Sequence, residues 1–254
     1  MSFDNKHAVI TGGANGIGRC IAEAFLREGA AVAVIDIDKH AGDVLLKKHE
    51  KLSFFHGDIA EKEVLRRFAA SLDKPVSCLI NNACIGRHGI LSNCSYEDFE
   101  YVQRVGVTAP YYLTSLLLQL NRLAPDASII NISSTRASQS QQDTEAYSAA
   151  KGGISALTHA MAISLAGKAR VNAICPGWVE TANYHNDAAI PAHSKQDNLQ
   201  HPSGRVGAPE DIAEAVLFLC GAKAGFITGE SVTIDGGMSK LMIYHNDHGW
   251  KMEQ

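Results

Sequence analysis

A tyrosine and a lysine, Tyr147 and Lys151, stand four residues apart in a strongly helical pattern. Side chains at this spacing share one face of a helix. A phenol keeps its proton up to about pH 10, but a neighbouring ammonium favours the phenolate, so such a pair could exchange a proton with an alcohol or carbonyl oxygen. Ser134, which follows an apolar run, could donate a hydrogen bond to that oxygen. These three side chains are the predicted catalytic residues.

A glycine-rich segment, TGGANGIG at residues 11–18, lies between an apolar run and a helical pattern. Glycine backbones can approach a pyrophosphate closely, and the N–H groups at a helix start favour its charge. The spacing is GxxxGxG, and an acid, Asp36, ends the next apolar run. A carboxylate there can accept hydrogen bonds from both ribose hydroxyls and would repel a 2′-phosphate, so we predict NAD as the cofactor. An ordinary tight turn with a solvated acid is the alternative.

Composition and charge narrow the function classes. The chain has 254 residues and a formal net charge of -4, with no block of like charges, so nucleic acid is not an expected partner. No apolar run is long enough to span a bilayer, and the opening residues MSFDNKH lack the regions of a signal peptide. We expect a cytoplasmic protein without a membrane partner. The six cysteines form no CxxC pair and are expected as free thiols, and no spacing predicts a metal site.

Short β-branched runs alternate with helical patterns from end to end. The expected strands are residues 7–11, 31–36, 52–56, 78–81, 127–132, 170–175 and 231–234. The expected helices are residues 16–28, 41–50, 61–72, 96–123, 145–165 and 209–219, and Asp58 and Ser95 are suited to capping. Runs such as AVAVID are apolar on both faces, which is typical of parallel strands between helices. We therefore predict an α/β fold: one Rossmann-like domain, residues 1–254, with a doubly wound parallel sheet of about seven strands and helices on both faces.

Several residues are candidates for shaping a substrate pocket. Residues 180–205 are polar and aperiodic, so we expect a substrate loop there, with a surface insertion as the alternative. Arg136 could bind a carboxylate or phosphate or could be a surface charge, and Gln141, Gln142 and Trp178 could line the pocket. The tail, residues 241–254, is apolar for a terminus and is expected to pack onto another surface, such as a neighbouring subunit.

Further short motifs accompany these residues: Asp58, Asn81-Asn82-Ala83, Tyr147-Ser148-Ala149-Ala150-Lys151, Pro176-Gly177 with Thr181, and Asp235-Gly236-Gly237. With the glycine-rich segment and Ser134, they make the sequence resemble the short-chain dehydrogenase/reductase family in its one-domain form, over essentially the whole chain. The resemblance implies hydride transfer between a nicotinamide cofactor and a small-molecule secondary alcohol or ketone. It also implies a homotetramer, with a homodimer as the second expectation.

The resemblance assigns roles to individual residues. Asp58 and Ile59 should frame the adenine, Asn82 should support the cofactor side of the cleft, and Lys151 should also hold the nicotinamide ribose. Residues 174–181 should cover the nicotinamide carboxamide. The expected cofactor-binding residues are Gly12, Asn15, Gly16, Ile17, Gly18, Asp36, Ile37, Asp58, Ile59, Asn82, Ala83, Tyr147, Lys151, Pro176, Gly177, Val179 and Thr181.

Two residues depart from the family pattern. Gly106 stands where the family usually has an asparagine that kinks a long helix and holds a water for proton relay, and Cys84 stands where a glycine usually follows Asn-Asn-Ala. A glycine permits the same kink, and a backbone carbonyl can still hold water, so we expect weakened or rerouted proton transfer. We interpret Cys84 as a small apolar filler, with a reactive thiol as the alternative.

Three functional hypotheses follow from these features. The first is an NAD-dependent alcohol dehydrogenase or ketone reductase, because the glycine-rich segment, Asp36 and the three predicted catalytic residues are all present. The second is the same chemistry with NADP, since Arg19, in the helix after the glycine-rich segment, and Lys39, just after Asp36, could lie near enough to bind a 2′-phosphate. The third is a cofactor-binding scaffold with little turnover, which Gly106 motivates.

Overall fold

Seven parallel strands form one sheet in the computed structural model, in the order β3-β2-β1-β4-β5-β6-β7. The structure describes residues 2–185, 189, 191–244, 246 and 247. The strands are β1 (His7–Thr11), β2 (Ala31–Asp36), β3 (Leu52–His56), β4 (Val76–Asn81), β5 (Leu123–Ile132), β6 (Ala169–Pro176) and β7 (Ser231–Ile234). This arrangement confirms the predicted Rossmann-like α/β fold.

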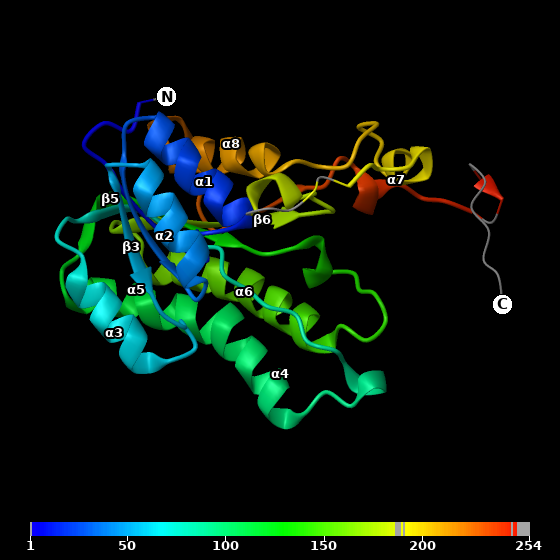
Figure 1. Ribbon diagram of the computed structural model, residues 1–254, viewed down its shortest axis with the longest axis horizontal. Coiled ribbons are helices and arrows are strands. Elements are labelled where there is room, and N and C mark those ends of the chain that lie inside the picture. Colours follow the sequence, from blue (N-terminus) through cyan, green and yellow to red (C-terminus); the bar gives the residue numbers. More distant parts are fainter. Residues whose placement is uncertain (1, 186–188, 190, 245, 248–254) are drawn as a thin grey trace.

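Helices cover both faces of the sheet because the strands are apolar on both. They are α1 (Gly16–Arg27), α2 (Lys39–Lys48), α3 (Lys62–Ser71), α4 (Tyr96–Gln103), α5 (Ala109–Gln119), α6 (Glu145–Ser164), α7 (Lys195–Leu199) and α8 (Pro209–Cys220). In β1, Ala8 and Ile10 join a core cluster with α1 and α8, whereas Val9 joins a second cluster with α3, α5 and α6. Figure 1 shows α1 and α8 on one side of the sheet and α4 and α6 on the other.

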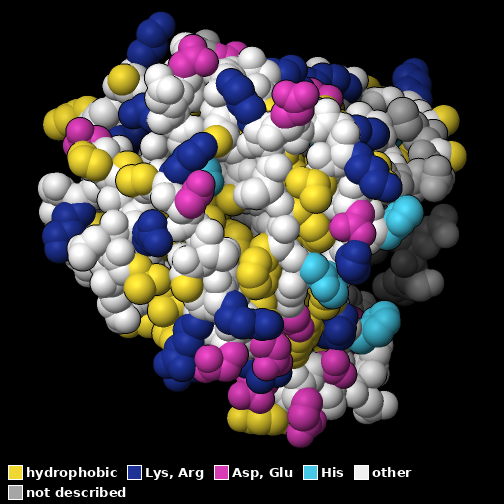
Figure 2. Space-filling model, turned by 60° about the vertical axis from the view of Figure 1, so that its left-hand side comes forward, with side chains coloured by type: hydrophobic (Ala, Val, Ile, Leu, Met, Phe, Trp, Pro, Cys, Tyr) yellow, Lys and Arg dark blue, Asp and Glu magenta, His cyan; other side chains and the backbone are white. Residues whose placement is uncertain are grey.

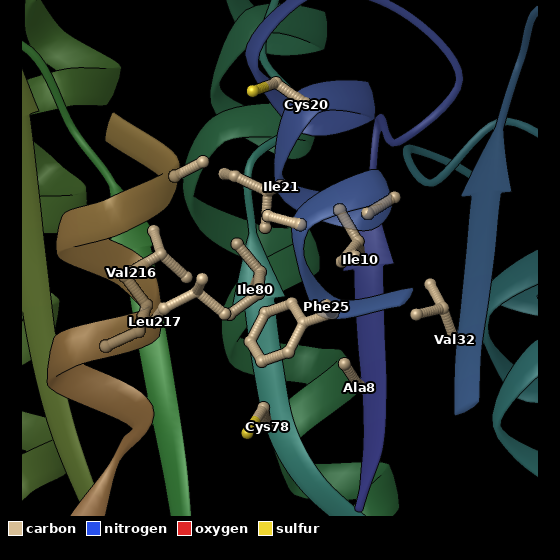
Figure 3. Close-up of a cluster of buried hydrophobic side chains, with 14 of the residues drawn as sticks. Ala8, Ile10, Cys20, Ile21, Phe25, Val32, Cys78, Ile80, Val216 and Leu217 are labelled. Carbon is tan, nitrogen blue, oxygen red and sulfur yellow. The ribbon is translucent and has the colours of Figure 1, made fainter. Parts of the chain in front are cut away.

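The packing of α1 fixes where the glycine-rich turn lies. Ile21 and Phe25 of this helix are fully buried. Figure 3 shows them in one cluster with Ile80 of the sheet and Leu217 of α8. Burying a side chain of this size contributes about 1.5–3 kcal/mol. The start of α1 is therefore held rigidly above the end of β1.

The expected long helix, residues 96–123, is interrupted. A π-helical turn, Arg104–Thr108, separates α4 from α5, with the Ala109 N–H donating to the Arg104 carbonyl. Pro110 has no N–H, which removes the regular hydrogen bond to the Gly106 carbonyl and favours the wider turn. At Gly106, where the sequence permits a kink, the structure has this π-helical turn. The helix prediction was wrong at its end, because Leu123 begins β5.

One of the two capping predictions is confirmed. Ser95 accepts a hydrogen bond from the Asp98 N–H at the start of α4. The Asp58 prediction was wrong: α3 begins after Glu61, and the Asp58 carboxylate accepts instead from the Ala60 N–H and the Tyr101 hydroxyl. The unexpected partner comes from a helix far along the chain, which a local pattern does not reveal.

The molecular surface carries both signs of charge. On the face drawn in Figure 2, lysine and arginine side chains lie among aspartate and glutamate side chains and form no extended patch of one sign. Among the helices of the described residues, none has the length and hydropathy needed to cross a bilayer.

Candidate active site

The chain order of the strands opens a crevice beside β1. From β1 the chain runs outward to β2 and β3 and then returns to β4 on the other side of β1. The loops after β1 and β4 therefore diverge, and ligands of open α/β sheets bind at such a switch point. A cleft of about 460 Å³ lies there. Most of the predicted cofactor-binding residues line it: Gly12, Asn15, Gly16, Ile17, Asp36, Ile37, Asp58, Ile59, Asn82, Ala83, Tyr147, Lys151, Pro176, Gly177, Val179 and Thr181.

The turn after β1 has no room for side chains at two of its glycines. A Cβ at Gly12, whose φ is 63°, would lie 2.8 Å from the Ala83 Cα. A Cβ at Gly18 would lie 2.0 Å from the Gly12 carbonyl oxygen. Gly18 is the predicted cofactor-binding residue that does not line the cleft; it lies behind the turn and allows α1 to pack against it. Gly12 and Gly18 together shape a bare backbone surface at the helix start.

Asn82 fastens the loop after β4 to this turn. Its side-chain amide donates to the Gly12 carbonyl at 2.8 Å and to the Thr11 carbonyl at 3.1 Å. The Thr11 hydroxyl in turn accepts from the backbone N–H groups of Asn82 and Ala83. Asn82 thus positions the two loops that flank the crevice.

Two carboxylates stand at fixed places along the cleft. Asp36 accepts hydrogen bonds from the Ala14 and Asp38 N–H groups, both at 2.9 Å, at the end of β2. Asp58 accepts from the Tyr101 hydroxyl at 2.9 Å, and burial, together with this carboxylate, raises the pKa of Tyr101. Tyr101 also lines the cleft, although the sequence offered no signal for it beyond its place in a helical pattern.

The predicted catalytic residues converge at the inner end of the cleft. Lys151, on α6, is only 4% exposed, and its ammonium donates to the Ile132 carbonyl at 2.7 Å. Its Nζ lies 5.3 Å from the centre of the Tyr147 ring. Ser134 follows β5, and its hydroxyl accepts from the Arg136 N–H at 3.1 Å. The end of β5 therefore positions both the serine and the lysine, and α6 adds the tyrosine.

A second hollow, of about 800 Å³, adjoins the cofactor cleft. The two share four lining residues, which include Ser134 and Tyr147. Arg136 and Trp178 line the second hollow, as expected of substrate contacts, whereas Gln142 is exposed and lies outside the lining; Gln141 takes that place. A substrate seated in the outer hollow would meet the cofactor cleft at the serine and the tyrosine.

The segment expected to form a substrate loop is partly anchored. The Trp178 ring lies 5.4 Å from the His193 ring and 6.0 Å from that of His201, which is 2% exposed. The Tyr184 hydroxyl donates to Glu210 of α8 at 2.7 Å. Residues 186–188 and 190 of this segment, and residues 245 and 248–254 of the predicted tail, lie outside the described residues. From the described part of the segment, Gln200 lines the outer hollow, and Thr181 and His185 line the cofactor cleft.

The two departures from the family pattern lie beside each other. A Cβ at Gly106 would lie 2.9 Å from the Ala150 Cβ and 3.5 Å from the Cys84 sulfur. Ala150 is fully buried on α6, next to Lys151. The Cys84 side chain therefore borders the space that a larger residue at position 106 would need.

Comparison with known proteins gives relatives over nearly the whole chain. Residues 12–239 match the family model described as Enoyl-(Acyl carrier protein) reductase. An uncharacterized oxidoreductase of Thermotoga maritima is 39% identical over 253 residues, which cover 95% of this chain and 99% of that protein. The 3-oxoacyl-(acyl-carrier-protein) reductase FabG of the same organism is 31% identical over 248 residues, 94% of this chain and 99% of that protein.

Solved structures agree with these matches. An apo SCOR enzyme from Clostridium thermocellum has a TM-score of 0.88 and 43% identity, covering 98% of this chain and 99% of its own. A 3-ketoacyl-(acyl-carrier-protein) reductase from Brucella melitensis, complexed with NADH, has a TM-score of 0.82 and 31% identity, covering 94% of this chain and all (100%) of its own. The sheet, the glycine-rich turn and these relatives lead to one conclusion: the chain belongs to the short-chain dehydrogenase/reductase family of oxidoreductases, which bind a nicotinamide cofactor.

Proposed function

We propose that the protein is an NAD(H)-dependent oxidoreductase that interconverts a secondary alcohol and its ketone. The observation that carries this proposal is the junction of the cofactor cleft with the outer hollow at Ser134 and Tyr147. A hydroxyl pair at such a junction can hold a substrate oxygen while the adjacent carbon faces the cofactor site.

The cleft suits a dinucleotide with free ribose hydroxyls. The bare turn at Gly12 and the start of α1 fit a pyrophosphate. The Asp36 carboxylate, held by two backbone N–H groups, can accept from ribose hydroxyls and repels a 2′-phosphate. Arg19 and Lys39, the cations that motivated the NADP alternative, are engaged with Glu23 at 3.0 Å and Asp43 at 2.6 Å. These contacts support NAD over NADP.

The residues at the junction divide the proton chemistry among them. A bound nicotinamide supplies the hydride donor or acceptor. In alcohol oxidation the Tyr147 oxygen would take the proton of the substrate hydroxyl, and in ketone reduction Tyr147 would return a proton to the substrate oxygen. Ser134 donates a hydrogen bond to the same oxygen. Lys151, fixed by the Ile132 carbonyl, places a buried positive charge beside the Tyr147 ring.

The π-helical turn bears on the scaffold alternative. Pro110 cannot donate to the Gly106 carbonyl, so this carbonyl lacks its regular helical partner. We infer that it can hold a water in place of the missing asparagine, which keeps a route for the proton and favours turnover over a scaffold role.

The protein is further proposed to be a homotetramer, with a homodimer as the alternative. Tyr96, Tyr111 and Ile163, on α4, α5 and α6, are 77%, 57% and 80% exposed, which is typical of faces that pair with another copy. Light scattering should give a multiple of the 27.2 kDa chain mass, and a monomer would contradict this.

Titration with NADH and NADPH, followed by nucleotide fluorescence, tests the main proposal. A panel of ketones, keto acids, sugars and steroids is then added and NADH loss is followed. We expect NADH to bind more tightly than NADPH and to be consumed with one class of carbonyl compound. Tight binding without consumption across the panel would favour the scaffold alternative.

A further inference from the structure

The outer hollow has an uneven charge lining. Two of the residues that line it, Arg87 and Arg136, are cations, and none of the described lining residues is an aspartate or glutamate. The remaining lining is made of backbone and of amide, hydroxyl and apolar side chains, with Tyr147 and Trp178 as its aromatic residues. A concave surface lined by one sign of charge concentrates ligands of the opposite sign.

The two arginines differ in what holds their charge. The Arg87 guanidinium donates to the Asp98 carboxylate at 3.1 Å and is therefore neutralised within the protein. The Arg136 guanidinium donates to the neutral side-chain oxygen of Gln141. Within the described part of the chain, no carboxylate lies within the 4.0 Å ion-pair distance of Arg136. Arg136 is therefore the cation of this hollow that has charge to offer a ligand.

Arg136 is also tied to both residues that flank the reacting oxygen. Its backbone N–H donates to the Ser134 hydroxyl at 3.1 Å, and its guanidinium carbon lies 5.9 Å from the centre of the Tyr147 ring. The planar guanidinium presents parallel N–H donors that match the oxygens of a carboxylate or phosphate. An anion bound there would lie close to the substrate atoms held by Ser134 and Tyr147.

We infer that the substrate carries an anionic group, a carboxylate or a phosphate, within a few bonds of the carbon that gains or loses hydride, and that Arg136 binds this group. The inference rests on the proposed oxidoreductase function and specifies its substrate class. Hydroxy acids with their keto acids, and phosphorylated hydroxyketones, belong to this class. The Arg87–Asp98 pair remains intact, and of this pair Arg87 lines the hollow.

Matched probes separate the charge of the substrate from its carbonyl group. The anionic probes are 3-oxobutanoate and hydroxyacetone phosphate, and their neutral counterparts are methyl 3-oxobutanoate and hydroxyacetone. Consumption of NADH gives KM and kcat for each probe, and the change in NADH fluorescence gives its binding to the protein–NADH complex. The carboxylate and phosphate arms show which anion is preferred.

We expect KM, or the dissociation constant where there is no turnover, to be about 10- to 100-fold lower for at least one anionic probe than for its neutral counterpart. Arg136→Met should reduce the ratio of the neutral to the anionic KM to about one. Arg136→Lys keeps the charge but loses the paired N–H donors of the guanidinium, so it should give an intermediate ratio. The matched control is Arg67→Met, because Arg67 lies on the exposed face of α3. This variant should have the same ratio of neutral to anionic KM as the unsubstituted protein. NADH affinity of each variant verifies folding.

The outcomes distinguish this inference from the proposed function. Turnover without preference for either anion, or a preference that persists in Arg136→Met, would overturn the inference and leave the oxidoreductase proposal standing. Anion-selective, Arg136-dependent binding without turnover of any probe would support Arg136 as the anion site and count against the proposed catalysis. Equal binding of anionic and neutral probes without turnover would overturn the inference on its own.

Discussion

A methyl group added at position 106 is expected to strain the contact between the π-helical turn and α6. The Cβ of Gly106→Ala would lie 2.9 Å from the Ala150 Cβ, closer than such atoms pack, in a fully buried place. Overpacking of this kind costs about 1–3 kcal/mol, and replacing a helical glycine by alanine returns up to about 1 kcal/mol. We therefore expect Gly106→Ala to lower the free energy of unfolding by up to about 2 kcal/mol.

Removal of the opposing methyl group should relieve the strain. Ala150→Gly alone should cost about 1 kcal/mol of helix propensity and about 0.8 kcal/mol of buried methyl. In the double variant the close contact disappears, so its destabilisation should fall short of the sum of the single effects by roughly 1–3 kcal/mol.

Urea unfolding of the four proteins measures this coupling directly. The slopes of the unfolding curves must agree for the comparison to hold. If the single effects add within about 0.5 kcal/mol, the packing argument is refuted. The same two positions also allow a test of proton relay. Gly106→Asn in the Ala150→Gly background shows whether an asparagine at position 106 raises turnover. An unchanged rate would mean that the missing asparagine does not limit proton relay.

Three further predictions concern cofactor choice, catalysis and stability. Asp36→Ala should reduce the preference for NADH over NADPH by at least about tenfold, because the carboxylate that repels a 2′-phosphate is lost. Fluorescence titration with both cofactors measures the preference, and an unchanged value would contradict the role of Asp36 in cofactor choice. Lys151→Ala should weaken both NADH binding and turnover, because the Ile132 carbonyl loses its hydrogen-bond donor and the cleft loses its buried positive charge. If neither NADH binding nor turnover changes, the lysine has no role in either. The Arg205 guanidinium holds the pKa of Asp211 below its usual 3.8, so the carboxylate stabilises the fold above that pH and the contribution disappears as pH falls through the lowered pKa. Asp211→Asn should therefore cost about 1 kcal/mol between pH 5 and 7 and nothing near pH 2, and a pH-independent difference in urea unfolding would contradict this.

Strand positions were predictable because their chemistry is local. Runs such as Ala31–Asp36 are apolar on both faces, and only a strand between two helical layers buries both. The glycine-rich turn was predictable because the atoms around Gly12 and Gly18 leave no room for a Cβ, so the turn requires glycine at both positions. Each of these features is marked by a pattern that spans only a few consecutive residues of the sequence.

Features that depend on tertiary contacts were not predictable. The pattern of residues 96–123 is helical throughout. Pro110 favours the π-helical turn in the structure, but a proline is equally compatible with the first turn of a separate helix, so the sequence does not specify which of the two forms. Asp58 is of a residue type that often caps helices, but its carboxylate accepts a hydrogen bond from Tyr101 instead. The sequence does not specify such long-range pairs. The placement of Arg136 over the Tyr147 ring likewise depends on the fold of the loop after β5.

Turnover and cofactor affinity of Tyr147→Phe test the central claim most directly. The substitution removes only the hydroxyl at the junction of the cofactor cleft and the outer hollow. We expect NADH affinity to stay within a few-fold while turnover of the preferred carbonyl substrate is abolished. Retention of more than about a tenth of the activity would contradict the assignment of Tyr147 as the acid and base.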